Sequence, residues 1–229
     1  MILGIETATR ALSVALVENG RLLASILVQR GNLHDELLLP VTSQLFQDAQ
    51  ADWSGVAAVA VSAGPGSFTG LRIGMAAAKG IAMSRNIPLV AVPTFDALAL
   101  HIAGSGIPAA DATLVTAFDA RGGDVYAARY EIHGGTMQRA AGPLAGTLDT
   151  ILPGLPDGTW LAGDAAAAQA ALSGGRYRAL PGTEAGVHAG AVALLGERLH
   201  AEGRHDSIDE CEPQYLREFR TTTPKIPGR

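Results

Sequence analysis

The order of strands and helices that the sequence predicts constrains the fold more than any other feature. Three short apolar runs come first, separated by turns, at residues 2–5, 11–17 and 22–28. Asn19-Gly20, between the second and third runs, is a strong hairpin signal because both residues tolerate positive φ. Helices are then predicted at residues 34–48, 71–84 and 95–103, and strands at 55–62 and 88–92. Pro40 interrupts the first of these helices, so the regular helix either starts nearer Leu39 or is kinked at Pro40. The first part of the chain is therefore expected to fold as βββαβαβ, with one further helix.

The same order begins again in the second half of the chain. Residues 104–112 place glycines and a proline between two periodic segments, which is typical of a domain boundary. Beyond it, strands are predicted at 113–118, 124–132, 136–140 and 160–163, and a short helix at 165–172. A carboxylate ends the first strand of each half, Glu6 in one and Asp119 in the other. This echo indicates a diverged internal duplication.

Two α/β domains follow from this repeat, and a chain of 229 residues is long enough for two compact halves. We expect an N-terminal domain at residues 1–104, which contains a glycine-rich loop and two prominent helices. The second domain, at 105–229, is expected to be less regular. It would close with a long helix at 183–202 and a C-terminal tail.

Charge limits the kinds of partner that the chain can bind by itself. The net charge is −5 and 17% of the residues are charged, which is typical of a folded soluble protein. A protein that binds nucleic acid alone usually has a basic surface, since its affinity comes from neutralised phosphates. Basic residues gather in one short tail that contains Arg217, Arg220, Lys225 and Arg229. Autonomous binding to nucleic acid is therefore disfavoured, apart from this local basic edge.

Cysteine usage and hydropathy indicate a reducing, aqueous compartment. Cys211 is the only cysteine, so neither an internal disulfide nor a thiolate metal cage can form. The first ten residues lack the basic start and long apolar segment of a secretion signal. No uncharged apolar stretch reaches the roughly 18 residues that span a bilayer. We expect a cytoplasmic protein with no membrane contact.

A glycine-rich loop between a buried strand and a helix is the most distinctive motif, VSAGPGSFTGLRIGMAAAKG at residues 61–80. Backbone N–H groups at a helix start can bind phosphate. However, the loop matches neither of the two specific phosphate-binding motifs, the P-loop and the dinucleotide fingerprint. Leu71 and Arg72 follow Gly70 where a P-loop needs Lys and Ser or Thr, and the glycine spacing is one residue too long for a dinucleotide fingerprint. A tight strand-to-helix turn is the plainer interpretation.

The helix after this loop carries a stripe of small residues at four-residue spacing: Gly70, Gly74, Ala78 and Ala82. Such a stripe lets another helix approach closely. Two interpretations are open, which are internal packing against the sheet and a seat for a helix of another protein. Further apolar side chains are predicted nearby, at Met75, Met83, Leu37, Val41 and Leu45. We favour the seat because of this additional apolar surface.

No complete catalytic or metal-binding set can be assembled from the sequence. His34 begins the first predicted helix, but Leu38 stands four residues later, where a histidine pair would need its second ligand. Ser67 in the glycine loop is more typical of a helix cap than of a nucleophile. Glu6 and Asp119 could hold Mg²⁺ through water across an inter-domain cleft. Strand-end carboxylates more commonly accept hydrogen bonds from turn N–H groups.

The chain resembles the TsaD-like family of the actin–hexokinase–Hsp70 superfamily over essentially its whole length. The segments that carry the resemblance are ILGIETATRALSVAL, HDELLLP, VSAGPGSFTGLRIGMAAAKGIA, DARGGDVYAARY and PQYLR. The resemblance implies two ribonuclease-H-like domains with mixed five-stranded sheets, the second of them reduced. It also implies a role in forming N6-threonylcarbamoyladenosine, next to the anticodon of tRNAs that read codons beginning with adenine.

In this family TsaD carries the transferase site, with a metal held by an H-x-x-x-H pair, and an ATPase, TsaE, joins the complex. Leu38 replaces the second histidine here, so the resemblance implies a non-catalytic subunit with no catalytic residues and no metal of its own. It would pair with TsaD, or with a second copy of itself when alone. It would have no cofactor of its own: ATP or ADP and Mg²⁺ would be bound by the complex. Contact with tRNA would be indirect, through the complex.

The resemblance also implies two sets of site residues. The partner interface is expected at His34, Leu37, Val41, Leu45, Phe68, Gly70, Leu71, Gly74, Met75, Ala78 and Ala82. Contacts to nucleotide or phosphate, if the chain makes any, are expected at Glu6, Thr7, Asp119 and Arg121. The family usually has Asp at the position of Glu6, and the extra methylene would displace a metal or phosphate contact.

Two other functions fit part of the same pattern. The paired strand-end acids and the glycine loop also suit a stand-alone ATP-dependent enzyme of the superfamily, such as a small kinase. A metallopeptidase that acts on TsaD would require a tightly bound metal, and no complete set of metal ligands can be assembled from the sequence.

Overall fold

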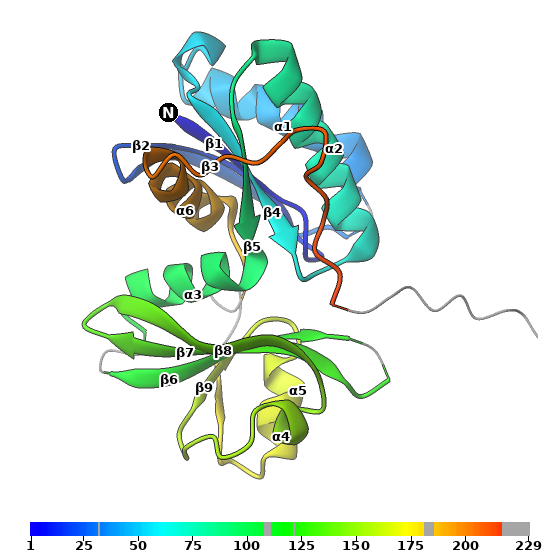
Figure 1. Ribbon diagram of the computed structural model, residues 1–229, viewed down its shortest axis with the longest axis vertical. Helices are drawn as coiled ribbons and strands as arrows, with labels where there is room; N and C mark the ends of the chain where they lie inside the picture. Colours follow the sequence, from blue (N-terminus) through cyan, green and yellow to red (C-terminus); the bar gives the residue numbers. More distant parts are fainter. Residues whose placement is uncertain (32, 108–110, 121, 181–185, 217–229) are drawn as a thin grey trace, which may run out of the picture.

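The structure is a computed structural model that describes residues 1–229 except 32, 108–110, 121, 181–185 and 217–229 (Figure 1). The described residues form two five-stranded sheets with helices outside and between them. This arrangement confirms the predicted fold class, an α/β protein with two mixed sheets. None of the described helices combines the length and the hydropathy that a membrane crossing demands.

The first sheet comes from the N-terminal half of the chain. Its strands are β1 (Ile2–Glu6), β2 (Leu12–Glu18), β3 (Arg21–Val28), β4 (Ala58–Gly64) and β5 (Leu89–Pro93), in the spatial order β3-β2-β1-β4-β5. Strands β1, β2 and β3 are antiparallel neighbours, whereas β4 and β5 run parallel to β1. The β2–β3 turn holds Asn19 and Gly20 at φ of 51° and 73°, so the predicted hairpin is confirmed.

The second sheet repeats this topology. Its strands are β6 (Ala112–Asp119), β7 (Val125–His133), β8 (Thr136–Gly146), β9 (Trp160–Ala162) and β10 (Arg178–Ala179), in the order β8-β7-β6-β9-β10. The first three strands are again antiparallel and the last two parallel to the first. The shared topology supports the predicted duplication. Strand β10, which has two residues, was not predicted because so short a segment carries no periodic signal.

The helices complete a layered arrangement. The first group comprises α1 (His34–Asp48), α2 (Phe68–Arg85) and α3 (Thr94–Gly104), with a short 3₁₀ turn at Trp53–Gly55. The second group comprises α4 (Leu148–Ile151), α5 (Ala166–Leu172) and α6 (Ala189–Ala201). Helices α1 and α2 cover the outer face of the first sheet, and α4 and α5 cover the outer face of the second (Figure 1). Helices α3 and α6 lie between the two sheets.

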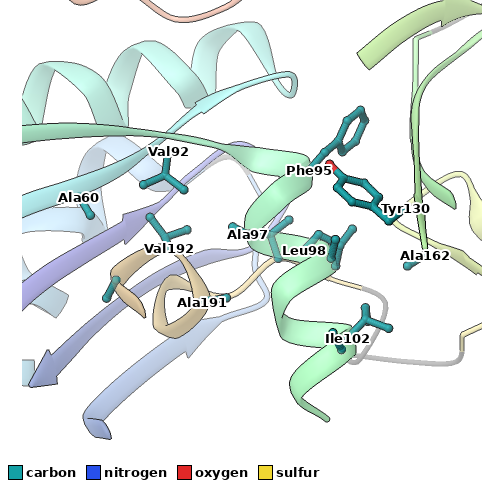
Figure 2. Close-up of a cluster of buried hydrophobic side chains, with 14 of the residues drawn as sticks. Ala60, Val92, Phe95, Ala97, Leu98, Ile102, Tyr130, Ala162, Ala191 and Val192 are labelled. Atoms are coloured by element: carbon teal, nitrogen blue, oxygen red, sulfur yellow. The ribbon is translucent and has the colours of Figure 1, made fainter. Parts of the chain in front are cut away.

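A single apolar core joins the two sheets through this central layer. Figure 2 labels side chains of this core from β4, β5, α3, β7, β9 and α6: Ala60, Val92, Phe95, Ala97, Leu98, Ile102, Tyr130, Ala162, Ala191 and Val192. The Tyr130 ring is fully buried, and its hydroxyl donates a hydrogen bond of 2.7 Å to Asp96 at the start of α3. Burial of this continuous core on both sides of α3 and α6 stabilises the arrangement of the two halves.

The last helix crosses the boundary that the sequence indicates. We expected residues 105–229 to form the second domain, but α6 packs on β1, β2 and β4 of the first sheet. Gly4 permits this close contact, because a Cβ there would overlap the carbonyl oxygen of Ala189. The helix also begins at Ala189 rather than at residue 183; residues 181–185 lie outside the described part of the chain.

Candidate functional site

The glycine loop makes the tight strand-to-helix turn that was its plainer interpretation. Ser67 is the N-cap of α2, and its Oγ accepts a hydrogen bond of 3.2 Å from the Gly70 N–H. The Ser67 N–H donates to the carbonyl of Ala8, at 2.7 Å, in the turn that follows β1. Ser67 is therefore a capping residue, and the loop is tied to the turn after β1.

The stripe of small residues faces the interior, which corrects our expectation that it forms a seat for another protein. Gly70, Gly74, Ala78 and Ala82 are all buried. A Cβ on Gly70 would overlap the carbonyl oxygen of Thr7, and a Cβ on Gly74 would overlap the Thr7 hydroxyl. The turn after β1 passes directly against α2, and glycines are the residues that allow this approach. Leu71 and Met75 are buried beside the stripe as well.

Of the expected interface residues of α1, two are buried and two are half-buried. Leu45 is fully buried, while Leu37 and Val41 are half-buried against the same core. The His34 ring is 8% exposed, and its Nε2–H donates a hydrogen bond of 3.1 Å to the carbonyl of Thr9. His34 thus ties the start of α1 to the turn after β1, as expected of a helix-start residue. Leu38 packs in the core with 2% exposure.

A different set of residues lies on the outside of α2. We call Ile73, Ala76, Ala77, Gly80 and Met83 the outer face of α2; Met83 is 64% exposed, Ala76 and Gly80 are exposed, and Ile73 and Ala77 are half-buried. Nothing lies within 4 Å of a Cβ built on Gly80. Phe68, at the start of the helix, is 37% exposed. These positions recur at intervals of three and four residues away from the buried stripe; from the sequence we singled out Met83 but not the other four.

The two outer helices carry charges of opposite sign. Helix α1 has the exposed acids Asp35, Glu36 and Asp48. Helix α2 has the basic residues Arg72, Lys79 and Arg85 and no acidic residue in its first turn. Arg72 and Lys79 lie on the side of α2 that faces residues 204–216, since Arg72 contacts the Tyr215 ring and Lys79 lies near Cys211.

The Glu6 carboxylate is enclosed within the first domain, which corrects its expected role as a contact in the cleft. Its Oε1 accepts a hydrogen bond of 2.6 Å from the Ala8 N–H, and its Oε2 accepts one from the Ser62 hydroxyl. Burial raises the pKa of Glu6 from 4.5 to about 7, although these hydrogen bonds oppose the shift. Glu6 therefore satisfies turn N–H groups, which was the commoner interpretation of a strand-end carboxylate.

Thr7 is also buried, so its expected role in the cleft is corrected too. Its side-chain oxygen has no hydrogen-bond partner among the described residues and lies under Gly74. Asp119 is exposed at the end of β6, where its N–H donates to Asp164 Oδ1 at 2.8 Å. Arg121 lies outside the described residues.

A cavity of about 270 Å³ lies where the strand ends of the two halves meet. Its lining includes Thr9, Arg10, Gln29, Phe118, Gly163 and Asp164. Within the described ranges, no group of three or more His, Cys, Asp or Glu side chains is close enough to hold a metal ion. Both oxygens of Glu6 already accept internal hydrogen bonds. The side chains present do not fit the Mg²⁺ site that Glu6 and Asp119 together could have formed.

Comparison with known proteins agrees with this architecture. Residues 29–183 match the family model of TsaD, tRNA N6-adenosine threonylcarbamoyltransferase. The chain is 29% identical over 251 residues to the tRNA threonylcarbamoyladenosine biosynthesis protein TsaB of Escherichia coli, covering 100% of this chain and 99% of that protein. It is 31% identical over 138 residues to TsaB of Bacillus subtilis, covering 60% and 58% of the two chains. The solved structure of YeaZ from Pseudomonas aeruginosa superimposes with a TM-score of 0.79 and 27% identity, covering 94% of this chain and 99% of that one.

Proposed function

The chain belongs to the TsaD family, with TsaB (YeaZ) proteins among its relatives, and from this premise we propose that it is a non-catalytic subunit for threonylcarbamoyladenosine formation in tRNA. It docks on the TsaD transferase, and TsaE joins the assembly. The observation that carries the docking proposal is the outer face of α2, on which Ala76, Gly80 and Met83 are exposed. ATP or ADP and Mg²⁺ belong to the assembled complex, in the cytoplasm.

The outer face of α2 has the composition of a close helix contact. Ala76 and Gly80 are small, so a partner helix can approach the backbone, while Met83 supplies a flexible apolar side chain that adapts to its partner. Exposed apolar surface of this kind is typical of a protein-binding site. In this proposal a TsaD helix packs on this face, and a helix of a second copy of this chain packs on it when TsaD is absent.

The structural roles of several candidate catalytic groups support the non-catalytic role. Leu38 occupies a core position where the resemblance requires a histidine ligand, and Ser67 caps a helix. Glu6 and Thr7 are fully buried in the first domain. A reactive site at these positions would require the N-terminal turn and α2 to separate.

The docking proposal predicts the effect of a charged side chain on the outer face of α2. Ala76→Arg is expected to weaken the complex with TsaD by about 100-fold, because a guanidinium replaces a methyl group at an apolar contact. Co-elution of the purified proteins measures this directly. In cells depleted of the wild-type chain, Ala76→Arg should fail to restore threonylcarbamoyladenosine, measured by mass spectrometry of tRNA nucleosides.

Ala167→Arg is the matched control, since Ala167 is exposed on α5 behind the second sheet. This variant is expected to co-elute with TsaD and to restore the modified nucleoside. Normal complex formation by Ala76→Arg would count decisively against docking through α2.

A second candidate function is favoured by the cavity near Arg10 and Asp164. A stand-alone ATP-dependent enzyme would use this space for its substrate, and the purified chain would turn over ATP with no companion protein. Asp119→Ala at the end of β6 should then abolish the turnover. A chain that binds TsaD but hydrolyses no ATP by itself excludes this second function.

A further inference from the structure

In the described part of the chain, the outermost strands are β3 and β5 in the first sheet and β8 and β10 in the second. The β5 edge is covered by Asp206, whose N–H donates to the carbonyl of Leu89 at 2.9 Å and whose Oδ2 accepts from the Ala91 N–H at 2.7 Å. The β8 edge contains Pro143, which has no N–H to donate, and two register shifts interrupt its pairing with β7. Strand β10 has only two residues. Such features protect three of the edges from pairing with another chain.

The edge of β3 lacks this protection. Strand β3 has eight residues, lies at the end of the first sheet (Figure 1) and pairs with β2 alone, and its other side makes no hydrogen bond to any described residue. It contains no proline, and residues 22–29 include no charged side chain. Its single register shift, opposite Leu16 and Val17 of β2, leaves residues 24–28 regularly paired. Backbone groups on the open side are therefore available to an added strand.

The side chains of this edge are apolar on both faces of the sheet. Leu22 and Leu23 are 54% and 48% exposed, and Ile26 and Leu27 are half-buried. Ile26 packs against the core beneath α1. Leu22 reaches the first turn of α6, where a Cβ built on Gly190 would lie 3.3 Å from its Cδ1. An added strand would therefore cover apolar surface as well as pair with the backbone.

An arginine stands at each end of the uncharged stretch. Arg21 and Arg30 are exposed, and neither forms an ion pair with another described residue. Glu18, which is opposite Arg21 in the hairpin, has its Oε1 3.5 Å from the terminal ammonium of Met1 instead. A bound segment with an acidic residue at each end would therefore place a carboxylate beside each arginine.

The same charges disfavour a second copy of this chain as the occupant. Two copies of β3 that pair antiparallel about the midpoint of Ser25 and Ile26 would place Arg21 of each copy opposite Arg30 of the other, since both arginines are equally far from that midpoint. Like charges directly opposite each other on neighbouring strands are destabilising. A segment of a different protein with acidic ends avoids this repulsion.

We propose that the open edge of β3 binds an extended segment of another protein, apolar in its centre and acidic at both ends, as an added strand of the first sheet. Main-chain hydrogen bonds supply the affinity, while the two arginines and the apolar side chains select the sequence. This inference goes beyond the proposed function, in which TsaD docks on the outer face of α2. Helix α2 packs over β1, β4 and β5, away from this edge.

The test measures the fluorescence anisotropy of labelled peptides with the full-length protein. The first peptide has the length of β3, alternates valine and threonine, and carries glutamate at each end. It should bind saturably, with a Kd below about 1 mM. The same peptide with lysine at each end should bind roughly fivefold more weakly. The glutamate peptide with N-methylated backbone amides should not bind, because it cannot donate hydrogen bonds to the carbonyls of β3.

Ser25→Glu tests the position of the peptide, since Ser25 is exposed in the middle of the edge. The added carboxylate has no partner in the bound segment, so the glutamate peptide should bind roughly fivefold more weakly. Gln138→Glu is the matched control: Gln138 is exposed on β8, the corresponding edge of the second sheet, and this variant should leave the Kd unchanged. In the wild type, the peptide should slow amide hydrogen exchange at residues 24–28 and leave β8 unchanged.

The proposal is wrong if the glutamate peptide does not bind below about 1 mM, or if its N-methylated form binds equally well. Equal losses in Ser25→Glu and Gln138→Glu, or slowed exchange confined to β8, would also overturn it. A wild-type dimer that Ser25→Glu converts to a monomer in analytical ultracentrifugation would assign the edge to a second copy instead. Thermal melting verifies the fold of both variants, and hydrogen exchange of the wild type decides the case if Ser25→Glu does not fold.

Discussion

Gly74→Leu is expected to destabilise the protein by at least about 4 kcal/mol, which is the range of severe core substitutions. Even the first carbon of the new side chain would overlap the Thr7 hydroxyl, and Thr7 is fully buried beneath α2. The remaining leucine carbons would have to push α2 away from the turn after β1. Urea denaturation of the purified variant measures the loss, and poor recovery of folded protein would itself agree with it.

Gly80→Leu is the control for this prediction, because it makes the same substitution in the same helix where a Cβ meets nothing within 4 Å. Its unfolding free energy should change by less than about 1 kcal/mol. If both variants unfold at the same urea concentration, the stripe is not packed against Thr7. The pair also shows why Gly74 is unsuitable for testing TsaD binding: complex formation would be lost through misfolding.

Glu6→Gln is expected to gain stability relative to the wild type as the pH rises. The folded protein raises the pKa of Glu6 from 4.5 to about 7, so between these values the folded state retains a proton that the unfolded chain releases. The wild type therefore loses stability as the pH rises through this window and remains penalised above it. A shift of this size corresponds to about 3 kcal/mol. Glutamine cannot ionise and escapes the penalty.

The measurement is the difference in unfolding free energy between Glu6→Gln and the wild type at a series of pH values from about 5 to about 8. Glu36→Gln serves as the control, since Glu36 is exposed on α1, and its difference from the wild type should stay nearly constant. A difference for Glu6→Gln that is equally constant would mean that the buried carboxyl does not retain its proton in the folded state.

Much of the first domain could be predicted from local pattern. The Asn19-Gly20 turn, the 34–48 range of α1 and the succession of the first five strands along the chain agree with the structure, and Pro40 lies inside α1 rather than before its start. Each of these features depends on residues close together in sequence: turn residues that tolerate positive φ, or apolar residues at the helical period. In the second domain the predicted strand at 160–163 and helix at 165–172 correspond to β9 and α5, but β10 has only two residues, too few for a period to be visible.

The candidate site was predicted less well. Sequence spacing revealed that Gly70, Gly74, Ala78 and Ala82 share one face of α2, but spacing alone does not say what that face touches. The turn at Thr7 comes from the other end of the domain and occupies the face completely. The residues left exposed, such as Ala76 and Met83, lie on the opposite side of the helix.

The sequence by itself therefore predicted which segments form helices and strands, where the chain turns, that Ser67 caps a helix, and that Leu38 replaces a second histidine ligand. Three-dimensional packing settled the rest: which side of α2 remains free, why the Glu6 carboxyl is enclosed, and how α6 comes to lie on the first sheet. The physical reason is that turns and helices depend on hydrogen bonds and periodicity within a few residues. Burial, in contrast, depends on which distant segments of the chain approach one another, as Gly4 and Ala189 do here.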